Sequence, residues 1–180
     1  MSFEVLKSEI IYKGRVFDLR KEQVRLPNGN TASLDIIDHP ESVTIVPVDQ
    51  DGMVWFIRQY RHAVGKYMLE LPAGVGEPGE SPEVSAKREI REEIKMAAGE
   101  LQWIGGIYLT PGYSNEYLHL YLATGLYPDP LGADEDEFMS VEKISAKQAL
   151  ALGETGQIED AKSLVALFWA RPYLAKLGYL

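Results

Sequence analysis

The sequence predicts an α+β fold in which a mixed β-sheet is covered by helices. Segments of strand-type composition outnumber helical segments, and several of them come before the first helix. The helical segments are isolated and do not alternate regularly with strands, which argues against a parallel sheet built from βαβ units. The length of 180 residues suits one compact domain that carries a small additional lobe.

Residues 1–40 are expected to form a small antiparallel sheet ahead of the main domain at residues 41–180. The turn signal Pro27-Asn28-Gly29-Asn30 separates two extended runs. Bulky apolar residues within these runs are typical of strands. The expected strands of this lobe are residues 5–12, 16–26 and 31–38.

The main domain is predicted to combine further strands with three helices. Asp51-Gly52 is a hairpin signal, and Ser81 followed by Pro82 is a good N-cap and first helical residue. Pro172 is expected to break the last helix, because proline has no backbone N–H. The expected strands are residues 42–48, 53–61, 67–71, 101–110, 117–126 and 139–143, and the expected helices are residues 82–94, 146–152 and 161–177.

The charge balance limits the classes of function. The chain has 27 acidic and 18 basic residues, a net charge of −9, and no basic cluster, which disfavours a nucleic-acid partner. It has no cysteine, so disulfides and thiolate chemistry are excluded. No apolar run approaches the roughly 20 residues of a membrane helix, and the first residues do not resemble a secretion signal. These features predict a cytoplasmic protein without a membrane partner.

Three glutamates on the predicted helix 82–94 are the strongest candidates for chemistry. Glu89, Glu92 and Glu93 stand at i, i+3 and i+4, so their side chains share one face. Because like charges at this spacing destabilise a helix, the glutamates either bind a hard cation such as Mg²⁺ or Mn²⁺, or stay hydrated and pair with neighbouring basic residues. The apolar stripe beside them is expected to face the sheet and consists of Ala86, Ile90 and Ile94.

The surroundings of these glutamates resemble the Nudix box of the Nudix hydrolases. The box reads Gly-x5-Glu-x7-Arg-Glu-(apolar)-x-Glu-Glu-x-Gly-(apolar), and here it runs from Gly74 through Glu80 and Arg88 to Met96. Every specified position matches except Lys95, where the box has glycine. Glycine at this point ends a helix through a left-handed cap, so the departure concerns the helix end and no metal ligand. The resemblance implies the Nudix fold, an α/β/α sandwich.

The resemblance also implies a role for each part of the box. In the family, metals are bound by the glutamate after the arginine, by the Glu-Glu pair, and by a backbone carbonyl beside the first glycine. The corresponding residues here are Glu89, Glu92, Glu93 and Ala73, and Glu92 and Glu93 are also the implied catalytic residues. The implied structural residues are Gly74, Glu80 and Arg88. We expect Gly74 to permit a tight turn and Arg88, as a bidentate donor, to pair with Glu80.

Features outside the box resemble the branch that hydrolyses ADP-ribose and ADP-sugars. Arg58-Gln59-Tyr60-Arg61 precedes Leu71-Pro72-Ala73-Gly74, and Pro111 follows Met96 by fifteen residues. In this branch an N-terminal lobe, which would be residues 1–40 here, forms domain-swapped homodimers. An acidic loop, which would be residues 134–137 here, supplies a catalytic glutamate. Either Glu135 or Glu137 suits the role of base, and we assign Glu135 as the base and Glu137 as a residue that assists the metal.

The candidate substrate-binding residues each have a simpler structural interpretation. Arg58 and Arg61 contact phosphate or ribose, or they only occupy a strand end; Arg61 is the favoured contact. Pro111 and Gly112 belong to the substrate site or form a plain turn, and Glu116 holds substrate hydroxyls or is a surface acid. Phe17 stacks on adenine or belongs to the core, and the usual burial of aromatic residues favours the core.

The function that the resemblance implies is Mg²⁺-dependent hydrolysis of ADP-ribose or a related ADP-sugar, giving AMP and a sugar phosphate, with Mn²⁺ as an alternative metal. The first alternative keeps the chemistry and changes the substrate to GDP-mannose, FAD, NADH or a diadenosine compound. The second is a non-catalytic module that binds a nucleotide sugar, and the third is a metal-free structural protein. The intact glutamates favour an enzyme.

Overall fold

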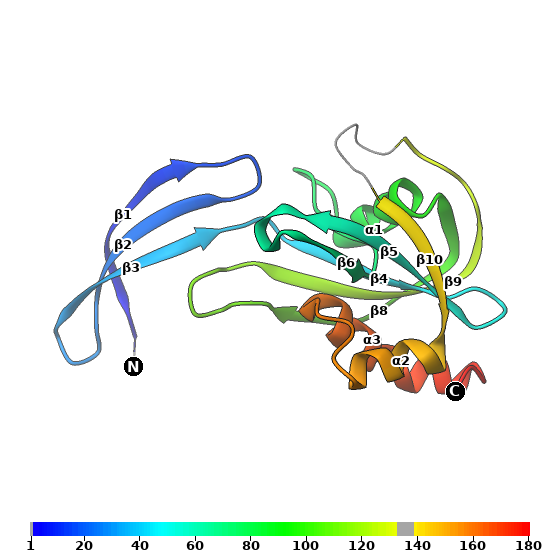
Figure 1. Cartoon of the computed structure of the whole chain (residues 1–180). Helices are drawn as coiled ribbons and strands as arrows, with labels where there is room; N and C mark the ends of the chain where they lie inside the picture. The colour runs from blue at the N-terminus through cyan, green and yellow to red at the C-terminus, as the bar shows by residue number, and fades with distance from the viewer. Residues whose placement is uncertain (1, 133–138) are drawn as a thin grey trace. The chain divides into compact units, whose positions relative to one another are not determined.

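In the computed structural model, which describes residues 2–132 and 139–180, the chain divides into two units (Figure 1). The first unit consists of Met1–Glu41 and Ile107–Tyr117. The second unit consists of Ser42–Gly106 and Leu118–Leu180. The predicted α+β class is confirmed, since a small antiparallel sheet precedes a larger arrangement of mixed sheet and helices.

The first unit is built on the antiparallel sheet β1-β2-β3. Its strands are β1 (Glu4–Lys13), β2 (Asp18–Arg25) and β3 (Thr31–Asp38). Gly29 adopts φ 87° in the turn between β2 and β3, where glycine avoids the steric cost of the left-handed region. Every residue of β1 is exposed, whereas Val24 of β2 is buried.

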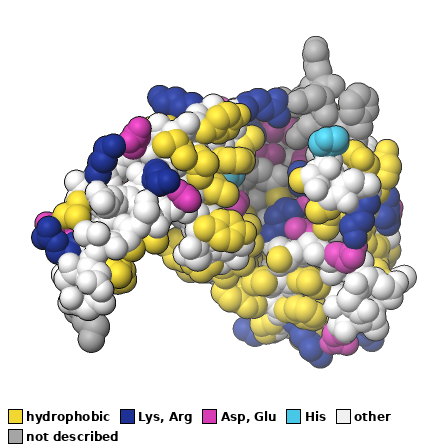
Figure 2. Space-filling model, turned by 60° about the vertical axis from the view of Figure 1, so that its left-hand side comes forward, with side chains coloured by type: hydrophobic (Ala, Val, Ile, Leu, Met, Phe, Trp, Pro, Cys, Tyr) yellow, Lys and Arg dark blue, Asp and Glu magenta, His cyan; other side chains and the backbone are white. Residues whose placement is uncertain are grey.

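Charged residues on this sheet are paired across and along the strands. Lys7 lies 2.6 Å from Glu9, and Arg25 lies 2.8 Å from Glu4. On the face shown in Figure 2, Lys and Arg side chains likewise lie next to Asp and Glu side chains. Exposed pairs of this kind contribute little stability.

The second unit contains the four-stranded mixed sheet β7-β4-β9-β8. Its central strand β4 pairs in parallel with β9 and antiparallel with β7. All six residues of β4 are buried, as expected for a strand that is covered on both faces. The bounds are β4 (Ser42–Pro47), β7 (Ala73–Val75), β8 (Met96–Tyr108) and β9 (Tyr117–Pro128).

A three-stranded antiparallel sheet, β10-β5-β6, completes the strands of the second unit. Its strands are β5 (Met53–Arg61), β6 (Lys66–Glu70) and β10 (Met139–Ser145), and the short 3₁₀ helix η1 (His62–Val64) joins β5 to β6. The turn before β5 is held by Asp49, whose carboxylate accepts hydrogen bonds from the backbone N–H groups of Asp51 and Met53. This side-chain bonding explains why the sequence turns there.

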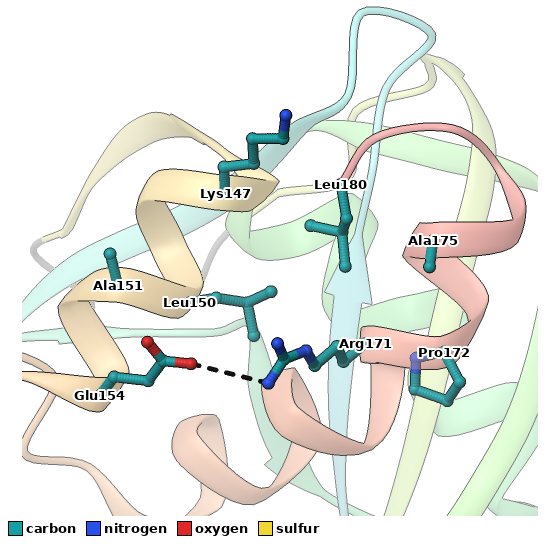
Figure 3. A pocket seen from close by; sticks show the side chains of 8 residues that line it. All are labelled: Lys147, Leu150, Ala151, Glu154, Arg171, Pro172, Ala175 and Leu180. Carbon is teal, nitrogen blue, oxygen red and sulfur yellow. Dashed lines mark ion pairs between the residues drawn. The ribbon is translucent and has the colours of Figure 1, made fainter.

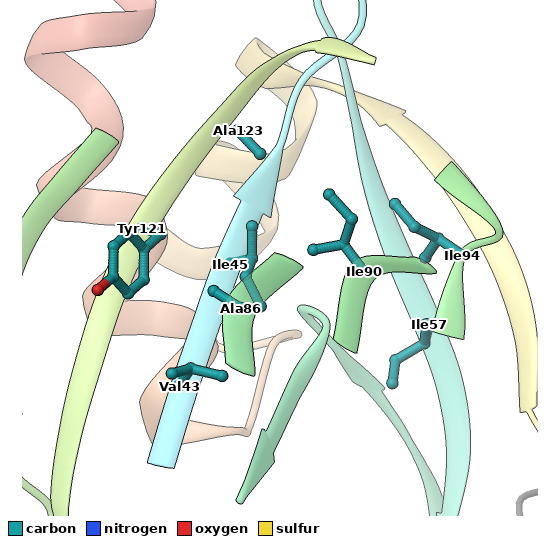
Figure 4. Close-up of a cluster of buried hydrophobic side chains, with 8 residues drawn as sticks. All are labelled: Val43, Ile45, Ile57, Ala86, Ile90, Ile94, Tyr121 and Ala123. Carbon is teal, nitrogen blue, oxygen red and sulfur yellow. The ribbon is translucent and has the colours of Figure 1, made fainter. Parts of the chain in front are cut away.

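Three helices pack on the sheets: α1 (Pro82–Glu93), α2 (Ala146–Glu154) and α3 (Ala161–Lys176). Helices α1 and α3 both pack against β4, and Figure 1 shows them on opposite sides of that strand. The predicted apolar stripe of α1 faces the sheet, since Ala86 and Ile90 are fully buried and Ile94 is 2% exposed. It joins the core cluster of Figure 4, which contains Val43, Ile45, Ile57, Ala86, Ile90, Ile94, Tyr121 and Ala123.

The predicted break before Pro172 is wrong, because α3 continues through this residue to Lys176. Proline removes one intrahelical hydrogen bond, which costs about 3 kcal/mol or more in an isolated helix. Here the helix has buried residues on both sides of the proline: Leu167 and Ala170 before it and Leu174 after it. Tertiary packing therefore overrides the local cost. Within the described residues, no helix has both the length and the apolar character needed to cross a membrane.

Candidate active site

Helix α1 presents the three candidate glutamates, and both of its ends are defined locally. At its start, the Ser81 hydroxyl accepts a hydrogen bond from the backbone N–H of Val84 at 3.4 Å, and Pro82 occupies the first turn. At its end, Lys95 adopts φ 62°, the left-handed conformation that glycine has in the Nudix box. The helix therefore ends without the glycine, at the cost of placing a lysine in an unfavourable region.

Two of the glutamates reach the strand β7. Glu89 and Glu93 are only 7% and 5% exposed, and the Glu93 carboxylate accepts a hydrogen bond from the backbone N–H of Ala73 at 2.9 Å. A Cβ on Gly74 would lie 1.9 Å from Glu89 Oε1. The reason for glycine at position 74 is thus space for this carboxylate, and the tight turn expected from the sequence is not its role, because Gly74 lies within β7.

Arg88 links the loop before α1 to its acidic face. Its guanidinium donates to both carboxylate oxygens of Glu80, each at 3.1 Å, and to the Val75 carbonyl at 3.1 Å. It also donates to Glu89 at 2.7 Å and to Glu92 at 2.8 Å. The hydrogen bond from Arg88 holds the pKa of Glu80 at about 2, well below its ordinary value of 4.5. The same interaction raises the pKa of Arg88.

The donors of this cluster suit a hard divalent cation. The carboxylates of Glu89 and Glu93 are oxygen ligands, and they meet a strand whose carbonyls are further oxygen donors. Within residues 2–132 and 139–180, however, no three acidic, His or Cys side chains stand close enough to hold a metal ion together. Arg88 supplies the positive charge between Glu89 and Glu92. Arg88 contacts Oε1 of Glu89 and Oε2 of Glu92, and each carboxylate has two oxygens, so a bound metal would share these two carboxylates with Arg88.

Arg61, the favoured phosphate contact, belongs to a buried charge network that sequence reasoning missed. Its guanidinium binds Glu70 in a bidentate pair, with distances of 2.8 and 2.7 Å. Lys162 of α3 binds the same carboxylate. Burial alone would raise the pKa of Glu70, but its hydrogen bonds and ion pairs with Arg61 and Lys162 lower it below the ordinary value. The available signal was an acidic residue that follows the apolar residues Met68 and Leu69 and directly precedes Leu71.

Arg58, the second candidate arginine on β5, pairs across the sheet with Glu142 of β10. The Arg58 side chain is 41% exposed and that of Glu142 is 36% exposed. The hydrogen bond to Arg58 lowers the pKa of Glu142. The pair agrees with the strand-surface interpretation of Arg58, and a role in phosphate binding stays a prediction.

Four candidate substrate residues belong to the first unit. Phe17 is 40% exposed, which contradicts the expectation that it is a core residue. It lines a cavity of about 370 Å³ together with Arg15, Asp38 and His39. Glu116 Oε1 lies 3.9 Å from His39 Nδ1. Pro111 and Gly112 lie in a turn closed by the hydrogen bond from Tyr113 N–H to the Thr110 carbonyl at 3.1 Å.

Glu135 and Glu137 lie outside the described residues. A cavity of about 600 Å³ lies between α2 and α3 (Figure 3), where Glu154 and Arg171 are 3.6 Å apart. No residue of the cavity was predicted as a site residue. The side chains of α1 and β7, and not the residues around this cavity, therefore form the candidate site.

The helix with its three glutamates, the loop held by Arg88 and the mixed sheet define the class of this protein. Residues 38–167 match the NUDIX domain family, and residues 3–33 match the nucleoside diphosphate sugar hydrolase N-terminal domain. The chain belongs to the NUDIX domain family.

Three proteins with known names show which members of the family this chain is similar to. The chain is 36% identical to the ADP-ribose pyrophosphatase of Bacillus subtilis (strain 168), over 91% of this chain and 90% of that protein. It is 34% identical to the methanol dehydrogenase activator of Bacillus methanolicus, with the same coverage. Among solved structures, the crystal structure of an ADP compounds hydrolase superposes with a TM-score of 0.89 at 27% identity, covering 100% of this chain and 98% of that one.

Proposed function

We propose that this Nudix protein is a pyrophosphohydrolase that cleaves the diphosphate of ADP-ribose or a related ADP-sugar into AMP and a sugar phosphate. The observation that carries the proposal is the meeting of Glu89 and Glu93 with the Ala73–Gly74 strand, beside an arginine that holds the loop. The relatives named ADP-ribose pyrophosphatase and ADP compounds hydrolase support the substrate class. Enzymes of the family generally depend on a divalent metal, and we propose Mg²⁺, with Mn²⁺ as a substitute.

The residues proposed to hold the metal are Glu89, Glu92, Glu93 and the Ala73 carbonyl. When bound, the metal would neutralise the diphosphate oxygens and lower the pKa of a water molecule. In the step itself, the water oxygen attacks one phosphorus, the bond from that phosphorus to the bridging oxygen breaks, and a carboxylate accepts the proton from water. We propose Glu135 as this base and Glu137 as a residue that assists the metal.

Arg61 is the proposed contact for the diphosphate. Two of its N–H groups are used by Glu70, while the side chain as a whole is 40% exposed. A guanidinium has five N–H donors, so donors remain for phosphate oxygens. We propose auxiliary substrate contacts for Arg58 and for four residues of the first unit, namely Phe17, Pro111, Gly112 and Glu116. The exposed Phe17 ring beside a cavity supports stacking on a base.

We also propose that residues 1–40 form a lobe that associates with a second copy of the chain, while residues 41–180 form the catalytic domain. All ten residues of β1 are exposed, including Val5, Ile10 and Ile11. An exposed apolar strand at the edge of a sheet favours association. Light scattering after gel filtration tests this proposal, and a monomer at micromolar concentration would contradict it. The cytoplasmic location stays a prediction from the sequence.

The activity is tested by incubating the purified protein with ADP-ribose, GDP-mannose, FAD and NADH in parallel, with Mg²⁺, with Mn²⁺, or with a chelator. Chromatography then quantifies AMP, GMP, FMN and nicotinamide mononucleotide. We expect AMP from ADP-ribose as the fastest product, with its release stopped by the chelator. Faster cleavage of another substrate would transfer the proposal to that substrate. Calorimetric binding of ADP-ribose without any product would instead indicate a non-catalytic binding module.

A further inference from the structure

Two buried polar side chains lie outside the Nudix box and connect it to the C-terminal helix. Glu70 ends β6 and is 1% exposed, and Ser163 lies in the first turn of α3 and is fully buried. A buried charge is costly unless it is paired and hydrogen-bonded. Both residues are fully engaged by partners 92 positions away along the chain, Glu70 by Lys162 and Ser163 by Leu71.

The first connection runs from α3 to Arg61. Asp160 caps α3, and its carboxylate lies 2.9 Å from the Lys162 ammonium group. Lys162 in turn binds Glu70, which forms the bidentate pair with Arg61. The side-chain exposure is 15% at Lys162, 1% at Glu70 and 40% at Arg61. A buried carboxylate held from two sides thus fixes the orientation of a guanidinium that reaches solvent.

The second connection runs from α3 to the strand beside the glutamates. The Ser163 hydroxyl accepts a hydrogen bond from the Leu71 N–H at 2.7 Å and donates to Asp160. The next residue, Pro72, accepts a hydrogen bond from Ile45 N–H at 2.9 Å, and Ala73 N–H donates to Glu93. Every residue of the segment 70–73 is therefore held by a partner from another element.

We propose that the first turn of α3 positions the active site through Lys162 and Ser163. Lys162 acts through Glu70 and sets the orientation of Arg61 toward an anionic substrate. Ser163 acts through Leu71 and sets the place of the Ala73 carbonyl relative to the glutamates of α1. Both are positioning residues, and the proposal rests on the proposed function for the roles of Arg61 and Ala73.

Two variants, Lys162→Met and Ser163→Ala, separate these actions; Lys162→Arg is the conservative rescue, and a fourth variant is the matched control. Lys162→Met is expected to raise the KM for ADP-ribose at least tenfold, with a smaller change in kcat and a dissociation constant for Mn²⁺ within twofold of wild type. Lys162→Arg keeps the charge and should bring the KM for ADP-ribose back close to the wild-type value. Ser163→Ala is expected to weaken Mn²⁺ binding, measured by electron paramagnetic resonance, at least fivefold. The control Lys66→Met removes an exposed ion pair with Glu159, at 2.6 Å, that also joins β6 to the residues before α3. It should leave the KM for ADP-ribose and the dissociation constant for Mn²⁺ within twofold of wild type.

Lower melting temperatures for Lys162→Met and Ser163→Ala, with KM, kcat and Mn²⁺ affinity all within twofold of wild type, would overturn the proposal and leave a structural role only. If Ser163→Ala does not fold, the comparison of Lys162→Met with Lys162→Arg still decides for Arg61. If the wild-type protein releases no product, the proposed function fails separately. Calorimetry with ADP-ribose then replaces KM, and Mn²⁺ affinity still tests the Ser163 connection.

Discussion

Replacing Gly74 by alanine is expected to inactivate the protein while leaving it folded. The new Cβ would lie 1.9 Å from Glu89 Oε1 and 2.0 Å from the Glu89 carboxyl carbon, whereas real Cβ contacts essentially never fall below 3.0 Å. Gly74 does not have a positive φ, so alanine fits the backbone and the clash with Glu89 is the obstacle. The carboxylate must therefore move by about 1 Å, since the strand is held by its pairing with β4.

The size of the effect follows from this displacement. A misplacement of about 1 Å at a catalytic group costs on the order of 100-fold in rate. Forcing an extra methyl group into a packed site costs about 1–3 kcal/mol of stability, and each kcal/mol lowers Tm by roughly 2–4 °C in a chain of this length. Gly74→Ala should thus lose most of its kcat at temperatures where it is still fully folded.

The measurement is the kcat for AMP release from ADP-ribose, together with the thermal unfolding curve. Gly153→Ala is the matched control, because the atoms nearest to a Cβ there are the ends of the Leu164 and Phe168 side chains, both at 3.2 Å. It should keep wild-type activity. In a Glu89→Ala background, Gly74→Ala should cost almost nothing further, because the two changes act through one carboxylate. A kcat for Gly74→Ala within threefold of wild type, or full additivity with Glu89→Ala, would refute the reasoning.

Three other outcomes are expected. Glu93→Gln should lower kcat by orders of magnitude with an unchanged circular dichroism spectrum, and a rate near that of wild type would remove Glu93 from the mechanism. Lys95→Gly removes the cost of about 1–2 kcal/mol that a lysine has in the left-handed region, but it adds about 0.5–1 kcal/mol of conformational entropy cost on folding. Tm should therefore rise by a few degrees at most. A clear fall in Tm would mean that the hydrogen bonds from Lys95 Nζ to the Glu92 and Leu131 carbonyls dominate. Because the pKa of Glu80 is lowered from 4.5 to about 2, its pair with Arg88 stabilises the fold above pH 4.5, and this stabilisation is lost as pH falls toward 2. The difference in unfolding free energy between wild type and Glu80→Gln, measured in urea, should shrink over that range. A constant difference would contradict the pairing.

Local sequence signals sufficed where one element determines its own structure. The predicted helix from Pro82 matches α1 because the Ser81 cap, the first-turn proline and the apolar stripe all agree. Strand β8 was predicted to begin at residue 101 but begins at Met96. Ala97, Ala98 and Gly99 have low strand propensity, and they are held in the sheet by the neighbouring β9.

The remaining features depend on contacts that no local pattern contains. The place of Gly74 is explained only by the approach of Glu89 from α1. The network of Glu70 depends on Lys162, which is 92 positions away in the sequence. The two side chains come into contact only because α3 packs in this place. In the same way, Pro172 breaks a helix by local rules, and the burial of Leu174 beyond it keeps the helix intact.

The acidic face of α1 shows why site and fold depend on each other here. On an isolated helix, Glu89, Glu92 and Glu93 would repel one another. In the folded chain, Arg88 contacts two of them and at the same time binds Glu80 of the preceding loop and the Val75 carbonyl at the end of β7. The guanidinium can satisfy all of these acceptors only when the loop is packed on the helix. The carboxylates are therefore held in place by tertiary structure, and a change that loosens the loop must also disturb the proposed metal ligands.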